Sequence, residues 1–183
     1  NKNLTIGSLH YWARLDDPDK YKDIMLGALS SHIMNSIKGG KKAGAHADVA
    51  NVIYYYFKDR FACSDQKCNT WFYFNEESGG KWEETELGHI LRKNLSTEIV
   101  DIYQYYMQKW SNELRTLDEN DEKYDIINNR VSGCCSVIIK LKDSGYKDKI
   151  MKECRENFYD KEFEELLDSN KNLIGFKNGI YDL

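Results

Sequence analysis

The chain has 183 residues, of which 41% are hydrophobic and 31% charged, enough for one folded domain with a buried core. No apolar run approaches the ~20 residues that a membrane span needs, and the first residues show no signal-peptide pattern, so we expect an intracellular protein without a membrane partner. The net charge of −4 argues against a domain that binds nucleic acid over its whole surface. The charge is uneven, however: residues 1–62 carry +3, residues 63–100 carry −3 and residues 101–183 carry −4. An anionic partner should therefore contact the N-terminal third first.

Residues 1–37 are predicted to form an N-terminal helical segment. Asp17-Pro18 is a helix-start signal, a capping carboxylate followed by proline at the first helical position, and it predicts a helix from Pro18 to about Ser36. Residues 38–47 follow as a basic, glycine-rich link, which we expect to be flexible. Residues 48–183 then form the main helical domain.

This domain is predicted to begin with a helix from Asp48 to about Phe61 and to continue into a β-hairpin. The aromatic run Trp71–Phe74 is strongly β-prone, and turn chemistry at residues 78–80 lets residues 81–84 pair back on it. Because this hairpin lies between long helices in the sequence, we expect it to project from them or to pack across them.

Helical periodicity is longest between Leu87 and Leu114, where apolar residues recur at steps of three or four. A single helix of about 28 residues would run roughly 40 Å and would form the spine of the domain. Further helices are predicted from Asp121 to Asp143, with Cys135 on its inward face, and from Ser144 onward. A short helical turn near Phe163 then leads to the end of the chain.

The chain ends in a second predicted hairpin, in which Asn178-Gly179 supplies a tight turn between two apolar runs, Leu173–Phe176 and Ile180–Leu183. A two-stranded hairpin is marginally stable alone, so this one must pack on the preceding helices or on further structure. Because the sequence stops within a strand, we interpret it as one piece of a larger protein. The expected fold class is mostly α (α+β), a multi-helix domain with a long central helix and two β-hairpins.

The sequence contains no convincing catalytic constellation. The run GGKK at residues 39–42 lacks the glycine spacing, the preceding strand and the hydroxyl of a phosphate-binding loop, so a basic link is the better interpretation. Asp16, Asp17 and Asp19 could suggest a two-metal site, but they coincide with a helix start, where carboxylates interact favourably with the helix dipole.

Metal binding has one incomplete candidate. Cys63 and Cys68 could be half of a zinc site, with His46 or His89 as partners, but the second pair of ligands that a full site needs is missing. We therefore predict no metal and no cofactor in this chain. The five cysteines are an odd number and are interpreted as reduced thiols of an intracellular protein.

Nucleic-acid contact is the function that the residue types favour most. Basic side chains beside aromatic rings hold single strands without sequence preference, and both kinds occur on the link, the start of the spine helix and the aromatic hairpin. The structural alternative is that the tryptophans belong to the core and the basic side chains are merely solvated. The candidates are Lys38, Lys41, Lys42, Arg92, Lys93, Trp71 and Trp82.

The closing run LLDSNKNLIGFKNGIYDL resembles the segment that precedes the helicase core in viral primase-helicases of the poxvirus and giant-virus type, whose motors belong to helicase superfamily 3. Three further stretches are similar to the same family: TIGSLHYWARLDDPDKY, HADVANVIYYYFKDRFAC, and NTWFYFNEESGGKWEE followed by LRKNLS. The four stretches are spread over nearly the whole chain in the family's order. The residues matching the closing motif, for which an architectural role is implied, are Leu173, Ile174, Phe176, Asn178, Gly179 and Asp182.

The resemblance implies a non-catalytic accessory domain between an N-terminal primase and a C-terminal ATPase. Its expected partners are those two domains, single-stranded or forked DNA, and further copies in a ring-shaped helicase, with ATP and Mg bound by the parent protein elsewhere. The expected location is the host cytoplasm or a viral replication site. Two alternatives stay open: a helical protein-protein interaction module that never touches DNA, and a small metal-dependent enzyme with zinc at Cys63 and Cys68.

Overall fold

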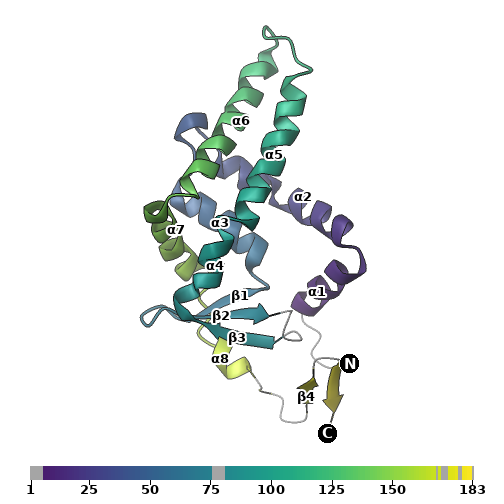
Figure 1. Cartoon of the computed structure of the whole chain (residues 1–183), viewed down its shortest axis with the longest axis vertical. Coiled ribbons are helices and arrows are strands. Elements are labelled where there is room, and N and C mark those ends of the chain that lie inside the picture. The colour runs from purple at the N-terminus through teal and green to yellow at the C-terminus, as the bar shows by residue number, and fades with distance from the viewer. Residues whose placement is uncertain (1–5, 76–80, 168, 170–172, 177–178, 183) are drawn as a thin grey trace.

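The computed structural model describes residues 6–75, 81–167, 169, 173–176 and 179–182. As predicted, the fold is mostly α (α+β), with helices packed on one another and on a small antiparallel sheet (Figure 1). Its elements are α1 (Ile6–Asp16), α2 (Pro18–Ser36), η1 (Gly40–Lys42), α3 (His46–Phe57), β1 (Phe61–Asp65), β2 (Thr70–Asn75), β3 (Lys81–Thr85), η2 (Glu86–Gly88), α4 (His89–Asn94), α5 (Glu98–Leu114), α6 (Glu122–Lys140), α7 (Ser144–Asn157), α8 (Phe163–Leu166), β4 (Leu173–Phe176) and β5 (Gly179–Asp182).

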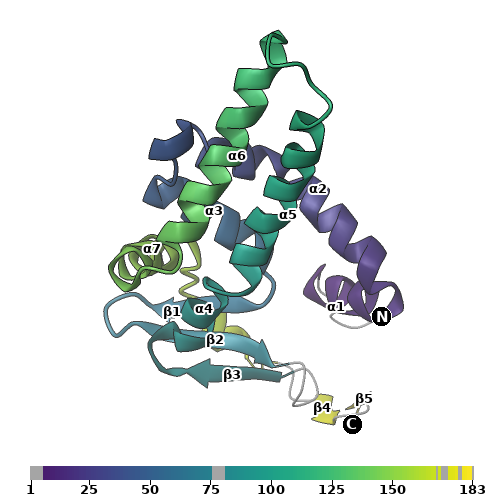
Figure 2. The same ribbon diagram turned by 45° about the horizontal axis from the view of Figure 1, so that its top comes forward.

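The core lies where α2, α3, α5, α6 and α7 meet. Helices α5 and α6 pack as an antiparallel pair that extends to one end of the molecule, while the sheet and α8 occupy the other end (Figures 1 and 2). Tyr103 on α5 is fully buried, its hydroxyl lies 2.7 Å from Ser36 Oγ on α2, and burial raises its pKa, so the phenol stays protonated. Tyr103 belongs to a core whose buried apolar residues include Leu29, Ile33, Val49, Ile53, Ile99, Val137 and Ile150.

Helix α2 has the bounds that the sequence predicts. Asp17 caps it by accepting a hydrogen bond from the Lys20 N–H at 3.0 Å, and Pro18 occupies the first turn, where a missing N–H costs nothing. A local start signal was therefore sufficient to place this helix.

The single spine helix predicted from Leu87 to Leu114 is wrong. The structure divides it into α4 and α5, because two hydroxyls at the break donate to backbone carbonyl oxygens. Ser96 Oγ donates to Leu141 O at 3.0 Å, and Thr97 Oγ1 donates to Lys93 O at 3.4 Å. Such bonds give the chain an alternative to the helical ladder. Thr97 then adopts a non-helical φ of −120° as the residue before α5.

The aromatic hairpin is confirmed but is part of a larger sheet. Strand β2 pairs with β3, with Trp71 opposite Thr85, and also with β1 in the order β1-β2-β3. The helix predicted from Asp48 is present as α3, but its predicted end at about Phe61 is wrong. Helix α3 ends at Phe57, and the Arg60 N–H donates to Phe57 O at 2.8 Å in the turn that follows. Phe61 then begins β1, so a strand replaces the expected last turn of the helix.

The terminal hairpin is confirmed at the level of the backbone. Strands β4 and β5 pair antiparallel, with Leu173 opposite Asp182, Ile174 opposite Tyr181 and Phe176 opposite Gly179. Asn178, predicted to sit in the turn, lies outside the described residues. The architectural role of this motif stays a prediction.

The sequence predicted a flexible link at residues 38–47. The structure instead packs this link against α6 and α7. Lys140 Nζ donates to Ala43 O at 2.6 Å and the Tyr146 hydroxyl donates to Gly44 O at 2.8 Å. Gly44 adopts a φ of +92°, which glycine reaches without strain, so a glycine-rich composition here supports a tight path rather than a loose tether. The division of the chain into segment, link and domain stays a prediction.

Candidate nucleic-acid interface

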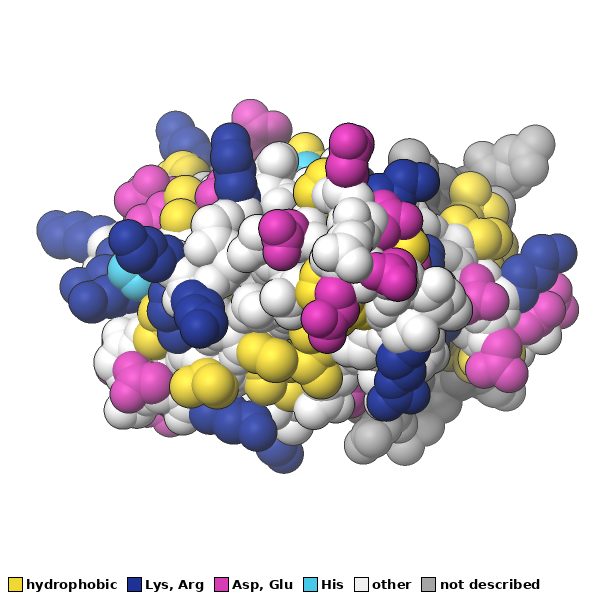
Figure 3. Space-filling model, turned by 90° about the horizontal axis from the view of Figure 1, so that it is seen from above, with side chains coloured by type: hydrophobic (Ala, Val, Ile, Leu, Met, Phe, Trp, Pro, Cys, Tyr) yellow, Lys and Arg dark blue, Asp and Glu magenta, His cyan; other side chains and the backbone are white. Residues whose placement is uncertain are grey.

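Five lysines from η1, from α6 with the turn after it, and from α7 form a basic surface. Lys41 and Lys42 come from η1, Lys140 from the end of α6, Lys142 from the turn that follows it, and Lys147 from the first turn of α7. Figure 3 shows Lys and Arg side chains gathered at one side of the molecule, the side on which α7 lies in Figure 1. We call these five residues the basic surface.

Packing of the link on α6 brings these lysines together. Ser136 Oγ on α6 donates to Lys41 O at 3.2 Å, and the Lys140 ammonium lies 5.8 Å from the Tyr146 ring centroid, a cation–π distance. Lys147 Nζ donates to Ser96 Oγ at 3.0 Å. Contacts between the link, α6, α7 and Ser96 therefore hold the surface together.

The nearest carboxylates have structural partners of their own. Asp143 caps α7 by accepting the Tyr146 N–H at 2.7 Å, and Asp148 pairs with Arg92 at 2.7 Å. Among the described residues, no carboxylate forms an ion pair with Lys41, Lys42 or Lys142. These ammonium groups are consequently available to an anionic ligand.

The other basic candidates are placed less favourably. Lys38 is exposed, but it lies beside Asn129 and Arg130 at a shallow pocket near the middle of α6. Arg92 is engaged with Asp148 and, at 3.4 Å, with Ser144 O, whereas its neighbour Lys93 is exposed. Whether any of them contacts DNA stays a prediction.

The two tryptophans of the hairpin have different environments. Trp71 is fully buried and donates its Nε1–H to Asn69 Oδ1 at 2.9 Å, so its proposed role as a surface platform for bases is wrong, since neither ring face reaches solvent. Gly88 allows this burial, because a Cβ there would lie 3.1 Å from the indole. Trp82 is only half-buried and packs against Phe163 with ring centroids 4.8 Å apart.

Sequence reasoning missed Lys140, Lys142 and Lys147. They belong to residues 101–183, whose net charge of −4 argues against contact with an anionic partner in this part of the chain. A usable signal was nevertheless present, because residues 140–147 hold three lysines, Lys140, Lys142 and Lys147, against the single Asp143. Regional averages conceal a short basic run of this kind.

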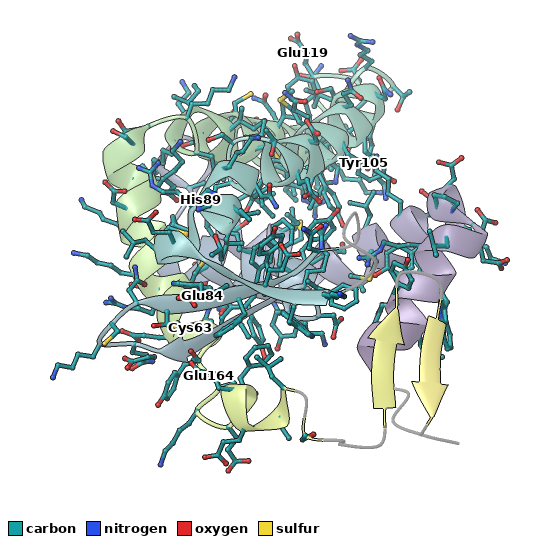
Figure 4. All side chains as sticks on the ribbon, turned by 60° about the horizontal axis from the view of Figure 1, so that its bottom comes forward. Cys63, Glu84, His89, Tyr105, Glu119 and Glu164 are labelled. Carbon is teal, nitrogen blue, oxygen red and sulfur yellow. The ribbon has the colours of Figure 1, made fainter. Side chains whose placement is uncertain are left out.

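The cysteines do not converge on a metal site. Cys63 is buried in β1 and Cys68 is exposed in the following turn, while His46 packs on Tyr146 and the His89 ring lies 3.1 Å from Thr85 Oγ1. Figure 4 shows Cys63 and His89 at separate places in the fold. In the part of the chain that the structure describes, no three His, Cys, Asp or Glu side chains cluster as metal ligands would.

Thiol reactivity should follow this placement. Burial raises the pKa of Cys63 to about 11 and that of Cys134 to about 12, and Cys154 is also buried, so these thiols are neutral and shielded near pH 8. Cys135, predicted to face inward, is exposed together with Cys68, because the face of α6 that packs inward carries Cys134 instead. We expect a thiol reagent to modify Cys68 and Cys135 in the native protein and all five cysteines after unfolding. Fast native modification of all five would contradict the fold.

No helix in the described ranges is long and apolar enough to cross a membrane. The structure defines a mostly helical domain with a small antiparallel sheet, on whose surface lysines of η1, α6 and α7 lie close together. The chain belongs to the family described as "D5 N terminal like", whose profile matches residues 50–183.

Two relatives align with almost the whole chain. It is 32% identical over 181 residues to the "Putative helicase L207/L206" of Acanthamoeba polyphaga mimivirus, covering 99% of this chain and 18% of that protein. It is 25% identical over 213 aligned positions to the "Putative helicase 022R" of Frog virus 3, covering 98% of this chain and 20% of that protein. The chain therefore spans about a fifth of the length of these relatives.

Proposed function

We propose that this chain is a non-catalytic accessory domain of a viral replicative primase-helicase, which guides single-stranded or forked DNA toward an ATPase motor elsewhere in the protein. ATP and Mg would be bound by that motor. Further copies of the protein would assemble with this domain into a ring, in the host cytoplasm or at a viral replication site.

The observation that carries the proposal is the basic surface. In a chain of net charge −4, five lysines from η1, α6 and α7 converge with few competing carboxylates, and backbone and side-chain contacts hold their elements in place. Lysines on a rigid surface neutralise phosphates without reading sequence, which suits a domain that passes DNA along. The chain also belongs to a family whose aligned relatives are named as putative helicases, which supports a role beside a helicase motor.

A second candidate function is a protein-protein interaction module without DNA contact. The observation that favours it is an exposed apolar face on α1, where Leu9, Trp12 and Leu15 are 57%, 49% and 64% exposed. Apolar residues gathered on one face commonly mark a protein contact. The two candidates differ in whether the purified chain binds DNA.

The test is fluorescence anisotropy of the purified chain with labelled single-stranded, forked and duplex DNA at low salt. We expect saturable binding to single-stranded and forked DNA, because phosphates should release counterions on meeting the basic surface. A folded chain that binds none of the three DNAs would contradict DNA guidance and favour the protein-interaction module.

A further inference from the structure

An aromatic cavity of about 450 Å³ lies between α3, β1, β3, α7 and α8, apart from the basic surface. It exists because the segment after α7 bonds to the free edge of β1: the Cys63 N–H donates to Phe158 O at 2.9 Å and the Asp160 N–H donates to Cys63 O at 2.9 Å. These bonds bring Tyr159 and the end of α7 beside Lys58 at the end of α3. The cavity is thus fixed by backbone pairing across about a hundred residues, as the spacing of Cys63 and Phe158 shows.

Aromatic rings line much of this cavity. Tyr54 packs edge-on against Phe158, with centroids 5.1 Å apart at 78°, and Trp82 packs edge-on against Phe163 at 4.8 Å and 78°. Tyr159 is 43% exposed, more than a ring that only fills a core would be. The six aromatic lining residues are Tyr54, Phe61, Trp82, Phe158, Tyr159 and Phe163.

Polar groups complete the lining. Lys58 is exposed at the end of α3 and supplies a cation, Asn157 supplies an amide, and Asp59 and Asp160 supply acceptors. Aromatic faces and hydrogen-bonding groups are what a nucleobase requires, and two carboxylates against one lysine suit the base rather than its phosphate. The volume lies in the range of pockets that hold small ligands of that size.

Helices α3 and α7 connect the cavity to the basic surface, because they run side by side in the same direction. Near their starts, the rings of His46 and Tyr146 lie 5.0 Å apart, and the end of α7 contacts the middle of α3, where Asn157 Nδ2 donates to Asn51 Oδ1 at 3.3 Å. From His46 to Lys58 the helix rises about 18 Å at 1.5 Å per residue, a distance that a few nucleotides of a single strand can span. One strand can therefore reach both places.

We propose that this cavity binds an unstacked nucleobase of a single strand whose phosphates lie on the basic surface. The proposal rests on the proposed function and names the part of the DNA that this second site recognises. The continuity of α3 and α7 with the basic surface favours a nucleic-acid strand over a peptide as the occupant.

The experiment compares two labelled oligonucleotides of about 12 nucleotides, within the site sizes of single-strand binders. One has ordinary bases in a sequence without self-complementarity, and the other has abasic residues at its central positions. The two strands therefore carry the same number of phosphates and differ only in the presence of the central bases. We expect the wild-type chain to bind the base-bearing strand about tenfold more tightly, because each stacked base contributes measurably. Tyr159→Ala should remove most of this preference, whereas Tyr159→Phe, which keeps the ring, should retain it.

Tyr105→Ala is the matched control, because Tyr105 is 39% exposed but lies on α5, away from Cys63 and the sheet (Figure 4). Equal binding of both strands by the wild-type chain would overturn the base cavity and leave DNA guidance standing. Binding of neither strand would overturn both proposals. A free deoxynucleoside monophosphate should displace the labelled oligonucleotide only at millimolar concentration. Displacement at a concentration equal to that of the oligonucleotide would identify a free nucleotide as the ligand and would overturn the proposal that a strand occupies the cavity.

Discussion

Replacing Gly133 by alanine is expected to destabilise the protein by about 1–3 kcal/mol, as over-packing of a tight interior does. Gly133 is buried in α6 where the end of α2 crosses it, and a Cβ at this position would lie 2.5 Å from Ile37 O and 2.7 Å from Ile37 Cβ. Backbone atoms cannot move aside as a flexible side chain can, so α2 and α6 would have to separate. The measurement is chemical denaturation followed by circular dichroism.

Gly27→Ala is the matched control. Gly27 is exposed in the middle of α2, and a Cβ there would meet nothing within 4 Å. Alanine has the higher helix propensity, so this variant should gain up to about 1 kcal/mol. A Gly133→Ala protein as stable as the wild type would contradict the close approach of α2 and α6, on which the position of η1 depends.

The second large effect is expected on DNA binding. Reversing three lysines of the basic surface together, Lys41→Glu, Lys42→Glu and Lys142→Glu, should weaken binding of single-stranded DNA roughly 100-fold at low salt, because phosphate contacts are lost and repulsion replaces them. All three side chains are exposed, so the fold should survive. Anisotropy titrations of the variant and the wild type measure the change.

The control must carry the same change in net charge. Lys22→Glu, Lys109→Glu and Lys123→Glu alter three exposed lysines on α2, on α5 and at the start of α6. If the basic surface binds the strand, this variant should lose only a fewfold in affinity through the overall field. Equal weakening by both triple variants would show that net charge, rather than this surface, determines binding.

The fold was predictable where the signal was local. Asp17-Pro18 placed α2, and the aromatic run from Trp71 predicted β2 and its hairpin partner. Strand β1 was not predictable, since its first residue, Phe61, fits the end of the preceding helix and its edge is bonded by residues such as Phe158, far along the chain. The break at Ser96 likewise depends on a tertiary contact, its bond to Leu141 O.

The candidate site was predictable only in part. Lys41 and Lys42 are distinctive in the sequence because they lie in a glycine-rich link, whereas Lys140 and Lys147 join them only where the link packs on α6 and α7. Trp71 and Trp82 looked alike in the sequence, and their burial separates them: one is inside the core and the other lines the cavity. Side-chain environment of this kind arises from packing, which periodicity alone does not specify.

The most direct test of DNA guidance is the salt dependence of single-strand binding by the wild-type chain. For single strands, the slope of log K against log salt is about −0.7 for each phosphate neutralised, so contacts by three to five of these lysines predict a slope between about −2 and −3.5. The triple variant at Lys41, Lys42 and Lys142 should show a correspondingly smaller slope. No binding at low salt, or binding whose affinity does not change with salt, would contradict the account.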